Sequence, residues 1–173
     1  MKKLIIVLSV LALIGAGCNW GKSEPAFVGT AYENSEYSFA FDYPETMDVH
    51  SRDPGLQPYK YLGMDVQFFA SVRDVVKDAQ PTNLAFLLAS PRLTADDFRA
   101  KLEASGAADL QEVETVKIND LTMYKFTNAT AMDPEIMKYH YLFDRGDQTI
   151  IISVFVGEFG PFEPVLSTFR SFK

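Results

Sequence analysis

Hydrophobic residues alternate strictly with small or polar ones near the start of the expected domain. Residues 36–44 read EYSFAFDYP, with aromatic side chains at every second position, and Pro44 closes the segment. Strict alternation is typical of a strand that buries one face. Residues 47–51 alternate in the same way, with His50 on the polar face, so a second strand is expected there. A turn region is expected over 52–58.

The next segment, residues 65–79, fits two periods. Its valine and phenylalanine residues recur at a spacing that favours the apolar stripe of a helix. The sequence FFASV inside it, residues 68–72, could also pair as a strand. The helix is the prediction for this segment. Residues 83–89 then form a short apolar run that predicts a strand.

Residues 94–98, TADDF, carry a helix start signal. Thr94 is a good N-cap residue, and Asp97 stands three positions later, as in an acidic variant of the capping box. The helix that follows carries Phe98 and Leu102, and it is expected to stop at Gly106.

Four more strands are expected to follow as an antiparallel meander. Two short polar turns, Asn119-Asp120 and residues 144–147, separate the members of each strand pair. The expected strands are 113–118, 121–128, 136–143 and 149–156. A last helix is expected over 162–172, because proline is accepted in the first turn of a helix.

The last strand of the meander differs from the others because it is apolar on both faces. It contains Ile150, Ile151, Ile152 and Val154, so it should lie centrally in a sheet that is covered on both sides. A central antiparallel sheet with helices on both faces meets that requirement. The expected fold is therefore α+β, in the three layers of an α/β/α sandwich.

The N-terminus predicts export and a lipid anchor. Lys2 and Lys3 precede an apolar run, residues 4–14, that is well short of the ~20 residues a membrane-spanning helix needs. Three small residues follow, and then Cys18, the single cysteine of the chain. This stretch resembles the lipobox of bacterial lipoproteins, although Gly15 stands where that family favours leucine. In that family the cysteine thiol receives a diacylglyceryl group and becomes the first residue after cleavage.

The resemblance implies a signal peptide over 1–17, a lipidated tether over 18–33 and a single domain over 34–173. Cys18 is the expected lipidation site, and its acyl chains would hold the protein on a bacterial membrane, outside the cytoplasm. The alternatives are a cleaved signal peptide with a free thiol and an uncleaved anchor. The lipid anchor is favoured, because an exposed unpaired cysteine is a liability in a secreted protein and the apolar run is short.

The composition indicates one acidic domain. Removing residues 1–17 takes away two of the 16 basic residues and leaves 14 against 23 acidic ones, a formal charge of −9. Such a surface disfavours nucleic acid as a partner. With its one cysteine acylated, the domain has no disulfide and depends on its apolar core, to which 14 Phe and 8 Tyr contribute.

Two short aromatic motifs lie at the two ends of the expected domain. They are YSFAFDYP at residues 37–44 and the tail SFRSFK, with the hairpin and helix before it. Together they resemble the PsbP-like family, named for an extrinsic subunit of photosystem II. That family commonly has Gly-Trp after the proline, where this chain has residues 45–47, ETM. The resemblance implies an α/β/α sandwich and a non-catalytic domain that binds a partner or a ligand.

The two histidines do not indicate an active site. His50 and His140 are both expected on polar, solvent-facing sides of their strands, and neither has a carboxylate–nucleophile pair beside it. The histidines lack zinc-binding spacing, and lipidation consumes Cys18, so neither a zinc site nor a cysteine nucleophile is expected.

The acidic residues likewise have simpler roles than metal binding. Asp96-Asp97 suits the first turn of a helix, and Glu112 and Glu114 suit the polar face of a strand better than a calcium site. Arg-Gly-Asp at residues 145–147 suits a hairpin turn rather than adhesion. No catalytic, cofactor-binding or metal-binding residue is therefore expected.

The expected function is that of a membrane-tethered, non-catalytic envelope lipoprotein that binds a protein partner or stabilises a complex. Its partners would be the membrane, through the lipid on Cys18, and an envelope protein. The alternative is a small-molecule-binding lipoprotein with an aromatic-lined pocket. An enclosed cavity would favour the alternative, whereas a filled core with an exposed apolar patch would favour the interaction domain.

Overall fold

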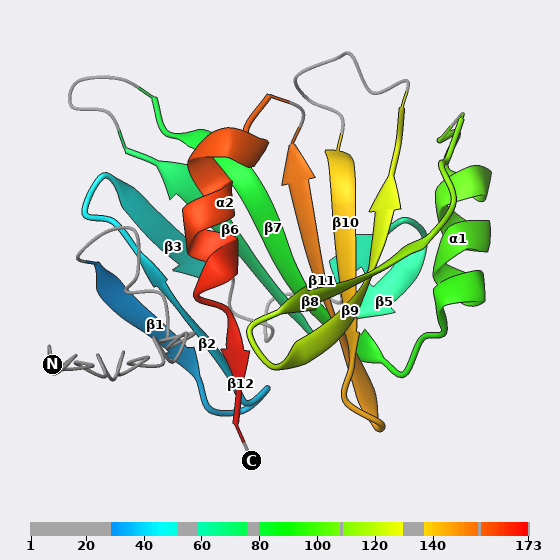
Figure 1. The fold of residues 1–173 in the computed structure, drawn as a ribbon, viewed down its shortest axis with the longest axis horizontal. Helices are drawn as coiled ribbons and strands as arrows, with labels where there is room; N and C mark the ends of the chain where they lie inside the picture. The colour runs from blue at the N-terminus through cyan, green and yellow to red at the C-terminus, as the bar shows by residue number, and fades with distance from the viewer. Residues whose placement is uncertain are drawn as a thin grey trace, which may run out of the picture.

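The computed structural model describes residues 29–51, 59–75, 80–107, 109–129, 137–155 and 157–172. Within these ranges the chain forms twelve strands and two helices. Strands account for 57% of the described residues and helices for 15%, so the fold is mostly β. A large antiparallel sheet runs through the molecule, and smaller elements pack on its two faces (Figure 1).

Seven antiparallel strands form the main sheet, in the order β3-β6-β7-β11-β10-β9-β8. Their bounds are, in that order, Met47–Ser51, Phe68–Asp74, Thr82–Pro91, Gln148–Phe155, Met137–Asp144, Leu121–Thr127 and Glu114–Ile118. The hairpins β8–β9 and β10–β11 form where the sequence predicts them. In the second turn Gly146 has a φ of 97° and donates its N–H to Asp144 Oδ1 at 2.7 Å. The prediction that residues 145–147 are a hairpin turn is confirmed.

Strand β11 lies in the middle of the main sheet and is buried on both faces. The relative exposure is at most 1% for Ile150, Ile151, Ile152 and Val154. The strand pairs with β7 along one edge and with β10 along the other. Branched apolar side chains suit such a strand because they pack well on a pleated surface. The prediction of a central, doubly buried strand is confirmed.

A three-stranded sheet and helix α2 cover one face of the main sheet. The small sheet has the order β1-β2-β12, with bounds Thr30–Asn34, Phe39–Tyr43 and Arg170–Ser171, and α2 spans Phe159–Ser167. Phe39 and Phe41 of β2 are buried in the same cluster as Phe162 and Phe169. The rings of Phe39 and Phe169 stack with centroids 5.5 Å apart. The end of the chain therefore packs against its first strands (Figure 1).

Helix α1 and a short hairpin lie on the other face. The helix spans Ala95–Ala104, and the hairpin consists of β4, Tyr59–Tyr61, and β5, Met64–Val66. Phe98 of α1 is fully buried, and its ring meets that of Phe126 edge-on at 5.2 Å. The predicted cap is confirmed, because the Asp97 N–H donates to Thr94 Oγ1 at 3.1 Å.

The expected α/β/α sandwich, in which a layer of helices covers each face of the sheet, is wrong. Each face of the main sheet carries one short helix, and strands cover much of the rest. The helix expected over 65–79 is also wrong, because this segment contains most of β5 and all of β6. Phe68 and Val72 of β6 pack in one core and Phe69 packs against the other. A strand buried on both faces carries apolar residues at spacings that also fit a helical stripe.

Two boundaries differ from the sequence prediction. β1 begins at Thr30, inside the segment expected to be a tether, because its residues pair with β2 from Thr30 opposite Tyr43 to Asn34 opposite Phe39. The last helix begins at Phe159 rather than 162. It ends at Ser167 rather than at 172, because residues 170–171 are extended and pair with β2 as β12.

Replacing Ile152 by aspartate tests the central strand. An unpaired carboxylate in a doubly covered apolar layer should lower the free energy of unfolding by on the order of 4 kcal/mol or more. Tyr124→Asp is the matched control, since Tyr124 lies in the same sheet but is 40% exposed. Urea unfolding followed by circular dichroism should show a lost or strongly shifted transition for Ile152→Asp alone. A near wild-type midpoint for that variant would contradict the doubly buried strand.

Candidate functional site

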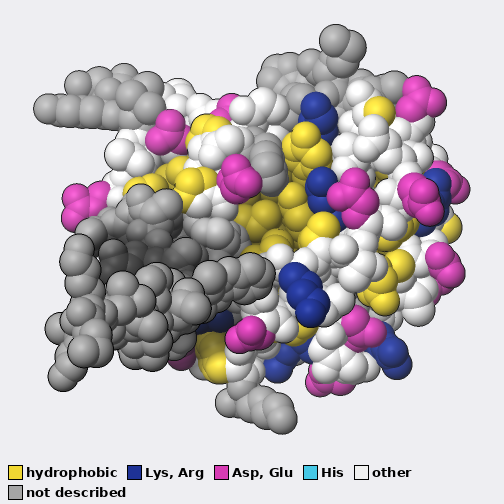
Figure 2. Space-filling view, in the orientation of Figure 1, with side chains coloured by type: hydrophobic (Ala, Val, Ile, Leu, Met, Phe, Trp, Pro, Cys, Tyr) yellow, Lys and Arg dark blue, Asp and Glu magenta, His cyan; other side chains and the backbone are white. Residues whose placement is uncertain are grey.

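The face of the main sheet that carries α2 also presents an apolar surface beside the helix. Helix α2 contacts β2, β7 and β11, and its core residues pack there. Figure 2 shows hydrophobic side chains gathered over β10 and β11, between α2 and the β8–β9 hairpin, with basic side chains beside them. We call this surface the front patch and define it by Glu114, Val116, Lys125, Lys138, Tyr139, Tyr141 and Glu163.

Tyr139 is the half-buried aromatic residue of the front patch. The Nζ atoms of Lys125 and Lys138 each lie 5.5 Å from the centroid of its ring. Lys125 also forms an ion pair with Glu114 at 3.1 Å, because the β8–β9 register places these two residues opposite each other. Lysine stems of this kind cover apolar surface while their ammonium groups reach water, and the cations are attracted to the ring face. The patch therefore combines an aromatic centre with positive charge.

Tyr141, two residues further along β10, forms the buried floor of the front patch and is 3% exposed. Burial is the main cause that raises the pKa of its phenol, and the nearby Tyr139, Glu163 and Glu114 raise it further. The phenol is consequently neutral at physiological pH, and it is neither an acid nor a nucleophile there. The two glutamates come from α2 and β8, so these elements bring negative charge to the floor of the patch from both sides.

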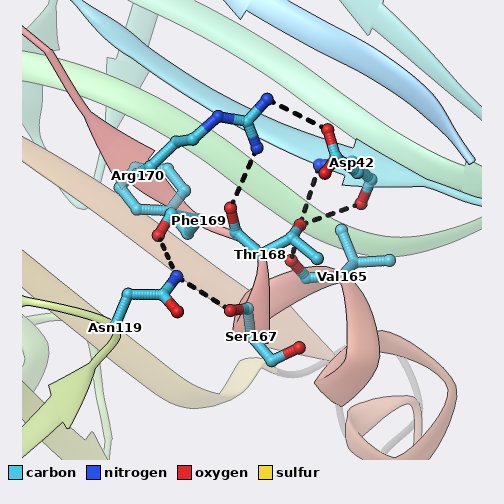
Figure 3. A network of polar contacts seen from close by, with 7 residues as sticks. All are labelled: Asp42, Asn119, Val165, Ser167, Thr168, Phe169 and Arg170. Atoms are coloured by element: carbon cyan, nitrogen blue, oxygen red, sulfur yellow. Dashed lines mark hydrogen bonds and ion pairs between the residues drawn. The ribbon is translucent and has the colours of Figure 1, made fainter. Parts of the chain in front are cut away.

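A clasp around Asn119 holds α2 against the β8–β9 hairpin (Figure 3). Asn119 occupies the turn of that hairpin with a φ of 52°. Its Nδ2 donates to the carbonyl oxygens of Ser167 at 2.8 Å and Phe169 at 2.7 Å. The Ser167 carbonyl is one of those that a helix leaves without a partner at its C-terminus, and Phe169 lies just beyond the C-cap Thr168. The clasp therefore sets the position of the hairpin, which is one border of the front patch.

The same helix end is joined to β2 through Thr168. Its Oγ1 accepts from the Asp42 N–H at 2.8 Å, and its single proton can go to Val165 O at 2.7 Å or Asp42 O at 3.1 Å. Arg170 adds an ion pair with Asp42 Oδ1 at 3.0 Å (Figure 3). Partly exposed ion pairs contribute little stability. The value of this one lies in aligning β12 with β2.

On the opposite face, the register of five neighbouring strands places one residue from each in a single row. From β3 to β10 the row contains His50, Ser71, Phe86, Ser153 and His140, each directly opposite the next. Directly opposed residues share a face of the sheet. Four strand spacings separate the histidines, roughly 19 Å. The row has an exposed end at His50 and a buried end at His140.

The prediction that His140 faces solvent is wrong. The residue is 2% exposed, and its Nδ1 lies 2.8 Å from Ser153 Oγ. The Tyr61 hydroxyl donates to the same Ser153 oxygen at 2.8 Å, and the Phe98 ring meets the imidazole edge-on at 5.5 Å. Burial lowers the pKa of His140 to about 3. His50 is exposed, as the sequence predicts.

Sequence reasoning missed His140 because β10 is covered on both faces. The alternation from Met137 to Phe143 suggests one polar face, but α1 crosses that face and brings Phe98 onto it. The only sequence signal was Leu142, which shares the face of His140 and is 1% exposed.

The Ser153–His140 pair has the spacing of a nucleophile and its base, but not the other properties. Ser153 is 0% exposed, and an imidazole with a pKa near 3 is a poor base at neutral pH. The Ser153–His140 pair is therefore a buried structural contact between β11 and β10. Other buried polar side chains in the described ranges also have partners, since none there has an unsatisfied nitrogen or oxygen atom.

Other sequence-based predictions concern metals and the N-terminus. Within the described ranges, no group of three or more His, Cys, Asp or Glu side chains could hold a metal ion. Cys18 and the segments 1–17 and 18–28 lie outside the described residues. Among the helices that the structure describes, none combines the length and the apolar character needed to cross a membrane.

Comparison with known proteins gives structural similarities only. No protein-family model matches the chain, and no curated protein matches it. CyanoP, the cyanobacterial PsbP of Synechocystis sp. PCC 6803, is similar over 88% of this chain and 99% of its own, with 14% identity and a TM-score of 0.49. A crystal structure from Bacteroides thetaiotaomicron VPI-5482 is similar over 84% of this chain, with 15% identity and a TM-score of 0.46. This chain spans 49% of the length of that protein.

Substitution of Asn119 tests the clasp. Asn119→Ala removes two hydrogen bonds and strains a left-handed residue, so the free energy of unfolding should fall by about 2–3 kcal/mol. Asn119→Gly is the matched variant, because it loses the same bonds but tolerates the positive φ. It should be about 1 kcal/mol more stable than Asn119→Ala. Urea titrations measure both values, and two variants within about 0.5 kcal/mol of wild type would show that the clasp carries no stability.

Proposed function

We propose that this chain is a membrane-tethered, non-catalytic envelope lipoprotein with a PsbP-like domain that binds a protein partner through its front patch. The observation that carries the proposal is the hydrophobic surface between α2 and the β8–β9 hairpin in Figure 2, where Tyr139 is half-buried and two lysine ammonium groups lie 5.5 Å from its ring centroid. Tyrosine is enriched at protein interfaces, because its ring is apolar and its hydroxyl can form a hydrogen bond.

The packing of the core supports a docking surface over an enclosed ligand pocket. Large side chains such as Phe39, Phe126, Phe162 and Met123 are less than 2% exposed in the described part of the chain. The aromatic side chains that a pocket would need are thus packed against one another. Tyr141 of the front patch belongs to this core, whereas Tyr139 lies half-buried at its edge, where a partner can reach it.

The proposed tether is based on Cys18 and the sequence around it. Acylation of Cys18 would place the domain on a bacterial membrane, outside the cytoplasm. Ten residues separate Cys18 from Gly29, the first described residue. At full extension the eleven steps from one Cα atom to the other span at most about 40 Å. A partner of this domain would therefore lie at the same membrane.

Cys18→Ser tests the anchor. The variant should lose metabolic labelling by a fatty-acid analogue and should leave the membrane fraction, because serine offers no thiol for the diacylglyceryl group. Wild-type protein from the same cells is the control and should be labelled and sediment with membranes. Equal labelling of the two proteins would contradict lipidation at Cys18.

A photo-reactive benzophenone residue at position 139 tests the front patch. Irradiation of cells should give a discrete cross-linked adduct from position 139, because this side chain lies at the centre of the proposed interface. Position 124 is the matched control, since Tyr124 is also a strand tyrosine of this sheet and is 40% exposed, but lies on the other face. The adduct should disappear in the Cys18→Ser background, where the domain is no longer held at the membrane. No adduct at 139, or the same adduct at 124, would contradict the proposal.

A further inference from the structure

The β4–β5 hairpin is a small element laid on the buried end of the histidine row. Its turn residues Leu62 and Gly63 both have positive φ, 49° and 73°, as in the tight turns favoured by two-residue hairpins. Met64 and Val66 are 7% exposed and pack in the cluster beneath α1. An isolated two-stranded hairpin is marginally stable, so this one depends on what it contacts.

Tyr61 links this hairpin to the central strand. Its hydroxyl donates to Ser153 Oγ at 2.8 Å, and Ser153 is in contact with His140 Nδ1 at 2.8 Å. The Gln67 N–H also donates to Ala89 O at 2.8 Å, just beyond the end of β5. The hairpin is therefore joined to the sheet by a hydrogen-bonded chain that ends on a histidine.

Counting protons shows which form of His140 this chain accepts. Ser153 has one proton, and its oxygen already receives the Tyr61 proton, so its own proton goes to His140 Nδ1. That arrangement requires an unprotonated Nδ1 and hence a neutral ring. If Nδ1 carried a proton, the hydrogen bond would reverse: Nδ1–H would donate to Ser153 Oγ, and the Ser153 proton would turn away from the ring, toward the Tyr61 oxygen. Protonation of His140 therefore displaces the proton that Tyr61 donates to Ser153.

Within the part of the chain that the structure describes, the groups that face His140 carry no compensating negative charge. The groups that face it are Phe98 from α1, Phe126 from β9, Ser153 from β11 and, through Ser153, the phenol of Tyr61 from β4. Tyr61 is the titratable group among them. Burial is the cause of the lowered pKa of His140, and the charged side chains of α1 do not contribute to it. A positive imidazole can be accommodated only if water reaches it.

We propose that the β4–β5 hairpin is an acid-released flap, held closed by the Tyr61–Ser153–His140 chain and released when His140 takes up a proton. Lifting the hairpin is the smallest movement that admits water, because β10 and β11 are central strands of the main sheet. The release uncovers apolar side chains that now pack beneath Met64 and Val66, among them Leu88 and Ile151.

Linkage gives the size of the effect. In the closed form the pKa of His140 is about 3, whereas an open, hydrated imidazole would return toward 6.5. The closed form is therefore fully favoured above pH 6.5 and is progressively lost as the pH falls toward 3. The population of the open form should rise about tenfold for each pH unit in that window, or about 100-fold between pH 6.5 and 4.5.

Amide hydrogen exchange of the full lipidated chain in detergent micelles tests the flap. After correction for intrinsic rates, protection of Met64–Val66 should fall about tenfold per pH unit below 6.5 while amides of β11 keep theirs. His140→Gln should remove this pH dependence, and His50→Gln is the matched control that should retain it. Tyr61→Phe should open the hairpin roughly fivefold more already at neutral pH, because one hydrogen bond is lost.

Three results would overturn the proposal. The first is protection of β5 that does not change with pH, and the second is the same pH dependence in His140→Gln as in wild type. The third is equal loss of protection in α1 or β11, which would mean that a larger unit opens. If His140→Gln does not fold, nuclear magnetic resonance of the wild type decides the matter. A His140 ring that becomes charged near pH 6 while β5 stays protected would refute the flap.

Discussion

Burial of β11 on both faces is the constraint on which the other layers depend. A strand without a solvent-facing side must find a hydrogen-bond partner for every polar side chain it carries. Thr149 Oγ1 accepts from the Leu93 N–H at 2.9 Å, just before α1, and Ser153 meets Tyr61 and His140. The two buried polar residues of the central strand thus fix the two elements that cover that face, α1 and the β4–β5 hairpin. The polar residues of β11 position α1 and the β4–β5 hairpin, and an apolar residue of the strand, Ile151, packs in the same cluster as these two elements.

Local signals in the sequence predict a large part of this fold. The cap at Thr94, the Asn119-Asp120 turn and the apolar strand 149–156 each depend on neighbours close in the chain, and the structure contains all three. The helix predicted over 65–79 was wrong, because a strand buried on both faces lacks the alternation of apolar and polar residues that distinguishes a strand from a helix. The three-stranded sheet was not predicted either. Strand β12 has two residues and pairs with β2, which is far away in the sequence, so neither segment carries a local signal for this pairing.

The candidate site divides in the same way. His50 lies on the edge strand, where polar alternation does mean solvent, and its exposure follows from local pattern. His140 lies one strand from the centre, and its burial depends on Phe98, which α1 brings across the sheet. The front patch had only partial signals, since alternation marks Tyr139 and Tyr141 as inward-facing but does not say whether a helix covers them. Contacts between distant segments decide burial, and no short window of sequence contains them.

The pairing of β12 with β2 has a consequence for the order in which the domain can be completed. Chains are made and threaded from the N-terminus, at about 5–20 residues per second during synthesis, so β2 is available long before β12 exists. Until residues 170–171 arrive, one edge of β2 has no partner, and Phe39 lacks the ring of Phe169 that stacks on it. Residues 169–171 therefore close the core. A chain stopped or clipped before residue 169 would keep most of the described strands and still expose aromatic surface that invites association with other chains.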